Sequence, residues 1–235
     1  MSKFADIYGH EQIKEHLQNA IRLNKVSHAY IFNGPMGSGK KMTAGIFAET
    51  LQCEQHGQEP CGTCHSCIQS ESGNQPDIIW VHHEKPGSIG VDDVREQVIG
   101  DMQIKPYSSR YKIYIIDEAE KLTPQAQNAL LKTIEEPPAY GIIILLTTNA
   151  DTFLQTILSR CVRLDFRPLR DTLVTQYLQE KYDLTDYECR FATAFAQGKI
   201  GRAVTIATSK EFAQLKEEVM HVIRYAKEMT TAEIM

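Results

Sequence analysis

The sequence predicts an α/β protein in which a parallel sheet is covered by helices on both faces and is followed by a small helical domain. Short apolar runs alternate with helix-like segments up to about residue 167, and this alternation is typical of parallel sheets. From Pro168 onward the patterns are purely helical. A glycine-rich loop stands directly after the first apolar run, at Gly34 to Lys40, as in nucleotide-binding sheets.

Each expected strand is a short apolar run flanked by turn-forming or polar residues. In chain order the expected strands are His28–Asn33, Ile78–His82, Lys112–Ile116, Gly141–Thr148 and Val162–Phe166. Five helices are expected before and between these strands. The first begins at Gly9-His10-Glu11, and the second runs from the glycine-rich loop to about Gln52. The others are Val91–Met102, a helix capped by Thr123 that ends at Glu135, and Phe153–Ser159. The helical domain is expected at Asp171–Tyr182, Asp186–Gln197 and Arg202–Ser209, and Phe212–Met229 begins a further long helix.

Length and charge narrow the functional classes. The 235 residues contain no apolar run near the roughly 20 residues needed to cross a bilayer. The stretch Met1–Asp6 lacks the apolar core of a signal peptide, so we expect a cytoplasmic protein. A formal net charge of −5 argues against stand-alone, non-specific binding of nucleic acid.

The glycine-rich loop has the composition of a phosphate-binding loop, or P-loop. Gly34, Gly37 and Gly39 let the backbone curl around phosphates at a helix N-terminus, and Lys40 is expected to reach the β- and γ-phosphates. The next position ordinarily carries a Ser or Thr whose hydroxyl binds Mg²⁺, but here it is Lys41. The plainer interpretation is a tight strand-to-helix turn. We expect ATP or ADP to bind weakly or without metal, and Mg²⁺ is not favoured.

A second part of nucleotide chemistry follows the third expected strand. Asp117 and Glu118 stand where P-loop ATPases place the carboxylate of the Mg²⁺ shell and the carboxylate that polarises water. The alternative is a solvated strand end.

Cys53, Cys61, Cys64 and Cys67 form the pattern C-x7-C-x2-C-x2-C in a segment poor in apolar residues. Four thiolates around Zn²⁺ would order such a segment, because structural zinc is tetrahedral and contributes folding energy. His56 and His65 are alternative ligands. Ordinary cysteines in a loop, transient disulfides and a nucleic-acid-binding zinc knuckle are the other interpretations, and the last is disfavoured because the segment lacks Lys and Arg.

Several strings together resemble a family, the bacterial DNA polymerase III clamp-loader subunits of the AAA+ class. They are His28-Ala-Tyr-Ile-Phe-Asn-Gly-Pro, the four-cysteine insert, Ile115-Ile-Asp-Glu-Ala-Glu, Asn128-Ala-Leu-Leu-Lys-Thr-Ile-Glu-Glu-Pro-Pro138, Thr147-Thr-Asn and Ile157-Leu-Ser-Arg-Cys161. The delta prime type of subunit is the most similar, and the gamma/tau motor type is a close relative.

The resemblance implies roles for single residues. Thr148 matches the sensor of the γ-phosphate, and Arg160 matches the arginine finger that enters the ATP site of a neighbouring subunit. The second sensor of motor subunits carries Arg where this chain has Gly201, with Arg202 one residue away. The alternative for Arg160 is a surface arginine paired with a local carboxylate such as Asp165.

The resemblance also implies function and domains. It implies a non-motor, stator-like subunit of a hetero-pentameric ring with gamma/tau and delta subunits, which loads the sliding clamp on primed DNA; an active gamma/tau-type ATPase is the alternative. Whether the chain is itself an enzyme stays open, with little or no ATPase activity expected within the polymerase holoenzyme. The expected domains are 1–167 with the zinc module 53–67, a three-helix lid at 168–209, and at 210–235 the start of a truncated helical collar.

Overall fold

The computed structural model describes residues 2–83, 85–209, 212, 214, 218, 219, 221 and 222. The chain divides into two compact units, Met1–Arg167 and Pro168–Met235. Most of the helix expected at Phe212–Met229, and most of the expected collar segment at 210–235, lies outside the described residues. No helix in the described part is long and apolar enough to span a membrane.

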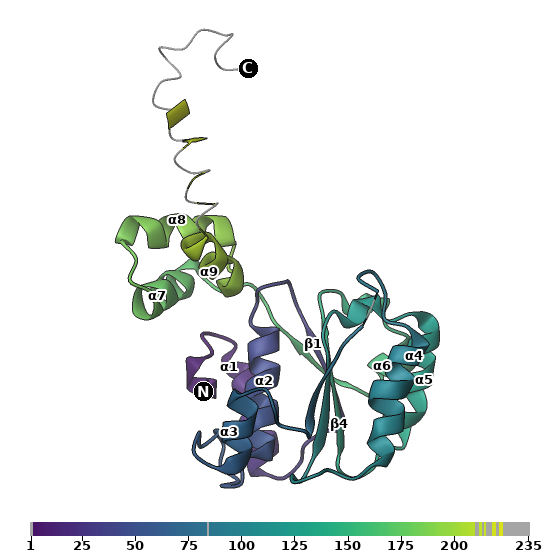
Figure 1. Ribbon diagram of the computed structural model, residues 1–235. Helices are drawn as coiled ribbons and strands as arrows, with labels where there is room; N and C mark the ends of the chain where they lie inside the picture. The colour runs from purple at the N-terminus through teal and green to yellow at the C-terminus, as the bar shows by residue number, and fades with distance from the viewer. Residues whose placement is uncertain are drawn as a thin grey trace. The chain divides into compact units, whose positions relative to one another are not determined.

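The first unit is built on a parallel five-stranded sheet with the order β2-β3-β4-β1-β5 (Figure 1). The strands are β1 (Ala29–Asn33), β2 (Ile78–Val81), β3 (Lys112–Ile116), β4 (Gly141–Thr147) and β5 (Val162–Asp165). The predicted fold class is confirmed, and the expected strand ends differ from these by at most one residue.

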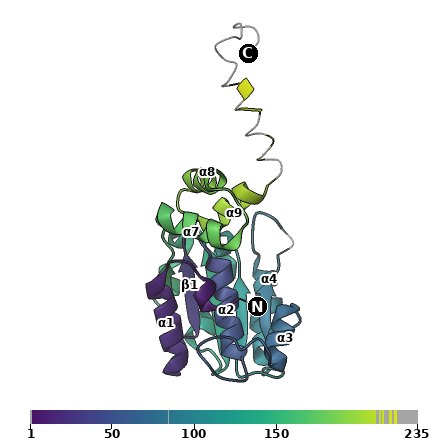
Figure 2. The same cartoon turned by 90° about the vertical axis from the view of Figure 1, so that its left-hand side faces the viewer.

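Helices cover both faces of this sheet. Figures 1 and 2 show α1, α2 and α3 on one face, and Figure 1 shows α4, α5 and α6 on the other. Their bounds are α1 (Glu11–Arg22), α2 (Lys40–Gln52), α3 (His65–Glu71), α4 (Val91–Val94), α5 (Pro124–Glu135) and α6 (Gln155–Leu158). Side chains alternate along each strand, so Ile113 and Ile115 of β3 join the core with α1 and α2, while Tyr114 and Ile116 join the opposite core.

The regular helix expected at Val91–Met102 is not regular in the structure. After α4 the chain continues as a π-helical segment, Arg95–Gly100, and a 3₁₀ turn, Asp101–Gln103. Val94, Val98 and Met102 are spaced four apart and are all at most 1% exposed. Residues four apart also share one face of a regular α-helix, so the sequence pattern cannot distinguish the two kinds of turn. The stripe stays buried while the hydrogen-bonding pattern of the turns changes.

A buried carboxylate closes the long connection between β2 and β3. Asp77, which is fully buried, accepts hydrogen bonds from the backbone N–H groups of Tyr107, Ser108 and Ser109 at 2.7, 3.0 and 3.0 Å. These three bonds satisfy the charge in the interior. The end of the connection is thereby held beside the start of β2.

The second unit contains three described helices, α7 (Asp171–Lys181), α8 (Asp186–Ala196) and α9 (Ile200–Thr208). Thr185 caps α8 by accepting a hydrogen bond from the Glu188 N–H, and the Glu188 side chain accepts one from the Thr185 N–H. The three helices share one small core, made of Val174, Leu178, Cys189, Ala192, Ala196 and Ala203. Gly201 and Arg202 both lie in the first turn of α9.

Candidate functional site

The residues expected to bind nucleotide lie where three neighbouring parallel strands end, and we call this edge of the sheet the P-loop crevice. β1 leads into the glycine-rich loop, β3 into Asp117 and β4 into Thr148, and β4 lies between β1 and β3. The carboxyl ends of adjacent parallel strands meet at one edge, which is where ligands bind in open α/β sheets. Gly34 opens the loop at a place where only glycine fits, because a Cβ there would lie 2.4 Å from the Phe166 carbonyl oxygen.

Lys40 is folded onto its own loop. Its Nζ donates hydrogen bonds to the carbonyl oxygens of Gly34 and Pro35, at 2.5 and 2.9 Å. Burial lowers the pKa of this ammonium, and the nearby Glu120 and Asp117 act in the opposite direction. Ser38, in the same loop, is only 6% exposed, and its Oγ has no hydrogen-bond partner among the described residues. The loop thus holds a buried cation and a buried hydroxyl at the start of α2.

Lys41 points at the carboxylate that follows β3. Its Nζ lies 3.2 Å from Oδ2 of Asp117 and 5.2 Å from the centre of the Trp80 ring. The Thr43 hydroxyl is buried and donates to the Gly39 carbonyl oxygen at 3.0 Å. A Mg²⁺ ion prefers oxygen ligands in octahedral geometry, and here an ammonium occupies the position of the hydroxyl and neutralises the carboxylate. These residues do not fit a magnesium site.

Glu118 is engaged with other side chains. Its backbone is left-handed, with φ of 50°, and its Oε2 accepts a hydrogen bond from Lys121 Nζ at 2.7 Å. His83 Nε2 lies 3.7 Å from the same oxygen. This oxygen would have to leave Lys121 before it could orient a water molecule, so the arrangement does not favour hydrolysis.

Thr148 is bound by a residue that sequence reasoning missed. Glu120 accepts a hydrogen bond from the Thr148 hydroxyl at 2.6 Å and another from its N–H at 3.2 Å. Burial alone would raise the pKa of Glu120, but hydrogen bonds from Thr148, from its own backbone N–H and from Thr147 together outweigh burial, and the pKa is lowered. The only signal in the sequence was its place two residues after Glu118. The expected phosphate sensor therefore contacts a carboxylate of its own chain.

Arg160 lies at the opposite edge of the sheet. It stands just before β5, which runs parallel to β1, whereas the glycine-rich loop follows the far end of β1. Its side chain is 41% exposed, and its guanidinium forms an ion pair with Glu135 at 3.1 Å and donates to the Thr156 carbonyl oxygen at 2.9 Å. Asp165, the partner considered from the sequence, pairs instead with Arg163 at 2.9 Å. Arg160 therefore does not join the groups of the crevice.

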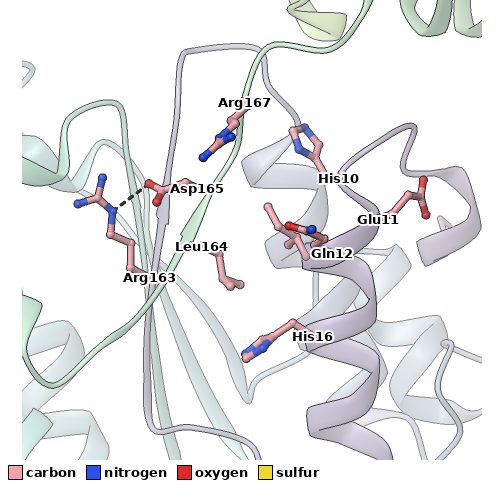
Figure 3. Close-up of a pocket in the computed structure, with 9 residues that line it drawn as sticks. His10, Glu11, Gln12, His16, Arg163, Leu164, Asp165 and Arg167 are labelled. Carbon is pink, nitrogen blue, oxygen red and sulfur yellow. Dashed lines mark hydrogen bonds and ion pairs between the residues drawn. The ribbon is translucent and has the colours of Figure 1, made fainter.

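A cleft of about 510 Å³ lies between α1 and β5 (Figure 3). His10 links this cleft to the glycine-rich loop, because its Nε2 lies 3.2 Å from the Ser38 carbonyl oxygen and its ring packs on Phe166. Burial lowers the pKa of His10. Side chains from both elements line the cleft: His10, Glu11, Gln12, Ile13, His16, Arg163, Leu164, Asp165 and Arg167.

The four cysteines of the insert converge. The sulfur atoms of Cys53, Cys61, Cys64 and Cys67 all lie within 4.8 Å of one another. Cys53 follows the last residue of α2, and Cys64 caps α3 by accepting the Cys67 N–H. His56 and His65 are outside this group, which is the one found in the part of the chain that the structure describes.

The thiols of this cluster differ in their ease of ionisation. The Thr63 backbone N–H and hydroxyl lower the pKa of Cys61 to about 6, whereas burial raises the pKa of Cys53 and of Cys67. A cation at the centre would favour the thiolate form of all four. The donor set and its spacing fit a metal ion.

Comparison with known proteins places these features in a family. The sequence profile described as "DNA polymerase III, delta subunit" matches residues 9–170. The tau subunit of DNA polymerase III from Bacillus subtilis is 40% identical over 77% of this chain, and the delta' subunit of the same organism is 34% identical over 87% of it. The chain spans 32% of the former and 61% of the latter.

Solved structures agree on the fold. A gamma subunit-related protein from Thermotoga maritima matches 79% of this chain, and 58% of its own, with a TM-score of 0.52 and 26% identity. The RuvB branch migration motor of the same organism matches 85% of this chain, and 61% of its own, with a TM-score of 0.55 and 16% identity, which shows the fold alone.

Proposed function

The chain belongs to the DNA polymerase III delta subunit family of clamp-loader proteins, and we propose that it is a non-motor subunit of the delta prime type. One observation carries the proposal: Lys41 replaces the hydroxyl that holds Mg²⁺ in P-loop ATPases and neutralises Asp117. The ion pair of Glu118 with Lys121 supports the proposal, because the carboxylate expected to polarise water is engaged by a lysine. Gly201, in place of the sensor arginine, points the same way.

In this role the chain acts on a neighbour's nucleotide rather than on its own. Arg160 is partly exposed at the edge of the sheet opposite to its own P-loop, so it can reach another subunit once it leaves Glu135. An arginine finger needs a permanent charge and forked donors, both of which guanidinium provides. We assign it to the ATP site of an adjacent gamma/tau subunit, in a cytoplasmic ring that also contains delta and loads the sliding clamp on primed DNA. Residues 168–209 then serve as the lid.

The test replaces Arg160 in this subunit alone. In a fully assembled ring we expect Arg160→Ala to reduce clamp-stimulated ATP turnover and clamp loading, by less than the ~10³-fold effect of an arginine finger at a single site, because other motor sites remain. Arg163→Ala is the matched control, since Arg163 is similarly exposed and also paired with a carboxylate. Unchanged turnover and loading by an assembled Arg160→Ala ring would show that Arg160 does not act as an arginine finger.

We further propose that the four-cysteine cluster holds one structural Zn²⁺. The convergence of four sulfur atoms in a segment with little apolar core supports this assignment. Freshly purified, reduced protein should contain about one zinc per chain. Cys64→Ser should lose the metal and leave α3 open to proteolysis, whereas Cys161→Ser, outside the cluster, should keep both. Metal analysis that finds no zinc in the unmodified protein would contradict the assignment.

The second candidate is an active gamma/tau-type ATPase. The relatives named tau are as similar as the delta' relative or more so, at 40% against 34% identity, and Lys40, Asp117 and Thr148 are all present. Robust magnesium-dependent ATP hydrolysis by the isolated chain, abolished by Lys40→Ala, would favour this candidate over the non-motor role.

A further inference from the structure

We propose that the P-loop crevice of this chain binds nucleotide as the free anion, with Lys41 in place of the metal, so that Mg²⁺ weakens binding instead of strengthening it. The inference deepens the non-motor role proposed above and rests on it in one respect: a crevice that does not hydrolyse nucleotide can still bind it. Its subject is this chain's own loop, whereas the arginine-finger proposal concerns the site of a neighbour.

The charges of the crevice suit a phosphate chain without a metal. Two ammonium groups, those of Lys40 and Lys41, stand at the start of α2, a helix of 13 residues whose N-terminus adds partial positive charge. A chelated Mg²⁺ would neutralise part of the phosphate charge that these groups attract. It would also approach Lys41, which is a like charge. The free nucleotide therefore complements the crevice better than its magnesium complex.

The position of Lys41 is the position of a bridging cation. Its ammonium lies 3.2 Å from Asp117 Oδ2 and carries three donor hydrogens. One donor can stay on the carboxylate while the others reach phosphate oxygens. In a motor subunit Mg²⁺ makes the same link between phosphates and this carboxylate. Lys41 thus screens Asp117 from the phosphates without any metal ligand.

Ser38 supplies an independent sign that the loop is built for a ligand. Its hydroxyl is buried within the loop and lacks a hydrogen-bond partner among the residues described, which is costly unless an acceptor arrives. Lys40 at present donates to the carbonyl oxygens of Gly34 and Pro35. An incoming phosphate offers acceptors for both side chains.

The experiment is calorimetric titration of the whole chain with ADP, once with EDTA and once with excess Mg²⁺. We expect ADP to bind in EDTA and its Kd to rise about five-fold when Mg²⁺ is added, the size of one added charge at a hydrated site. Lys41→Thr restores a hydroxyl, so Mg²⁺ should then tighten binding. Lys25→Thr, which removes an exposed lysine beyond the end of α1, should behave as the unmodified chain.

A second readout comes from Trp80, the single tryptophan of the sequence, whose ring centre lies 5.2 Å from Lys41 Nζ. If Lys41 turns to phosphate, ADP in EDTA should change the tryptophan fluorescence. Absence of ADP binding in EDTA, or a lower Kd with Mg²⁺ in the unmodified chain, would overturn the proposal. Neither result would bear on Arg160, whose test uses the assembled ring.

Discussion

The two ends of strand β3 carry the same kind of ion pair in two different settings. At its start, Lys112 Nζ lies 2.9 Å from Asp101 Oδ2; the lysine side chain is 4% exposed and the aspartate 35%, so the buried charge is that of the lysine. Just past its other end, Asp117 pairs with Lys41 at 3.2 Å, and the lysine is 69% exposed. A buried charged group cannot leave its partner without becoming an uncompensated charge in the interior. An exposed charged group can leave its partner, because water or a ligand can solvate it. The first end of the strand therefore serves the fold, and the second is available for binding.

The surroundings of the buried pair support this division. Lys112 Nζ also donates to the Asp101 and Ile104 carbonyl oxygens, and the Tyr114 hydroxyl donates to Asp101 Oδ2 at 2.8 Å. Together these bonds hold the 3₁₀ turn that ends the segment after α4 against β3. At the other end of the strand, the cation–π contact of Lys41 with Trp80 adds little to the stability of the fold, because both groups are partly hydrated.

The largest effect is expected at the buried end. Asp101→Ala leaves Lys112 with only carbonyl partners and should lower the free energy of unfolding by about 3 kcal/mol, as measured by urea denaturation. Lys112→Met combined with Asp101→Ala should recover part of the loss, because no buried charge remains unpaired. A loss below about 1 kcal/mol for the single variant would mean that burial does not distinguish the two pairs.

At the exposed end Lys41→Ala should change the free energy of unfolding by less than about 1 kcal/mol. The reason is that water solvates Asp117 once the lysine is removed. Any effect should shrink further in high salt, in contrast to that of Asp101→Ala. A loss as large as the one at Asp101 would make the Lys41–Asp117 pair a structural contact and would weaken its proposed role in binding.

The smallest effect concerns Glu120, beside Thr148. Since the pKa of Glu120 is lowered from its ordinary value of 4.5, its contribution to stability is present above that value and is lost as the pH falls through the lowered pKa. Thr148→Val removes the hydroxyl donor and should move the pKa of Glu120 back up, so that stability depends less on pH in this acidic range. A carboxyl NMR titration checks the shift, and an unchanged pKa would contradict the hydrogen bond between Thr148 and Glu120.

The positions of the strands along the chain could be predicted because they depend on local patterns, whereas their order in the sheet was not predicted. The apolar runs locate all five strands, and the spacing of the four cysteines anticipates their convergence. The resemblance supplied Thr148 and Arg160. The ion pairs and hydrogen bonds between side chains of the crevice could not be predicted in the same way. Lys41 with Asp117, and Thr148 with Glu120, join residues 76 and 28 positions apart, and their distances depend on the packing of separate strands.

The π-helical segment and the partner of Arg160 were missed for a related reason. Residues 91–102 have an ordinary helical pattern with Val94, Val98 and Met102 buried, and this local pattern does not distinguish π turns from α-helical turns. Glu135 ends α5 and is remote in sequence from Arg160, so the nearer Asp165 was the natural choice before the fold was known. Local sequence indicates which residues carry charge, and tertiary packing decides which charges meet.

Asp77 has a consequence for how this chain folds. Its bonds to Tyr107, Ser108 and Ser109 join positions 30 to 32 residues apart, between the start of β2 and the residues that precede β3. Parallel strands must close such a long connection before their hydrogen bonds and packing can stabilise the sheet. The entropy lost on loop closure makes such sheets slow to form. A carboxylate that captures three amides at the base of the connection fixes both strand starts in register. In the folded chain these three bonds therefore offset part of the loop-closure entropy of the β2–β3 connection.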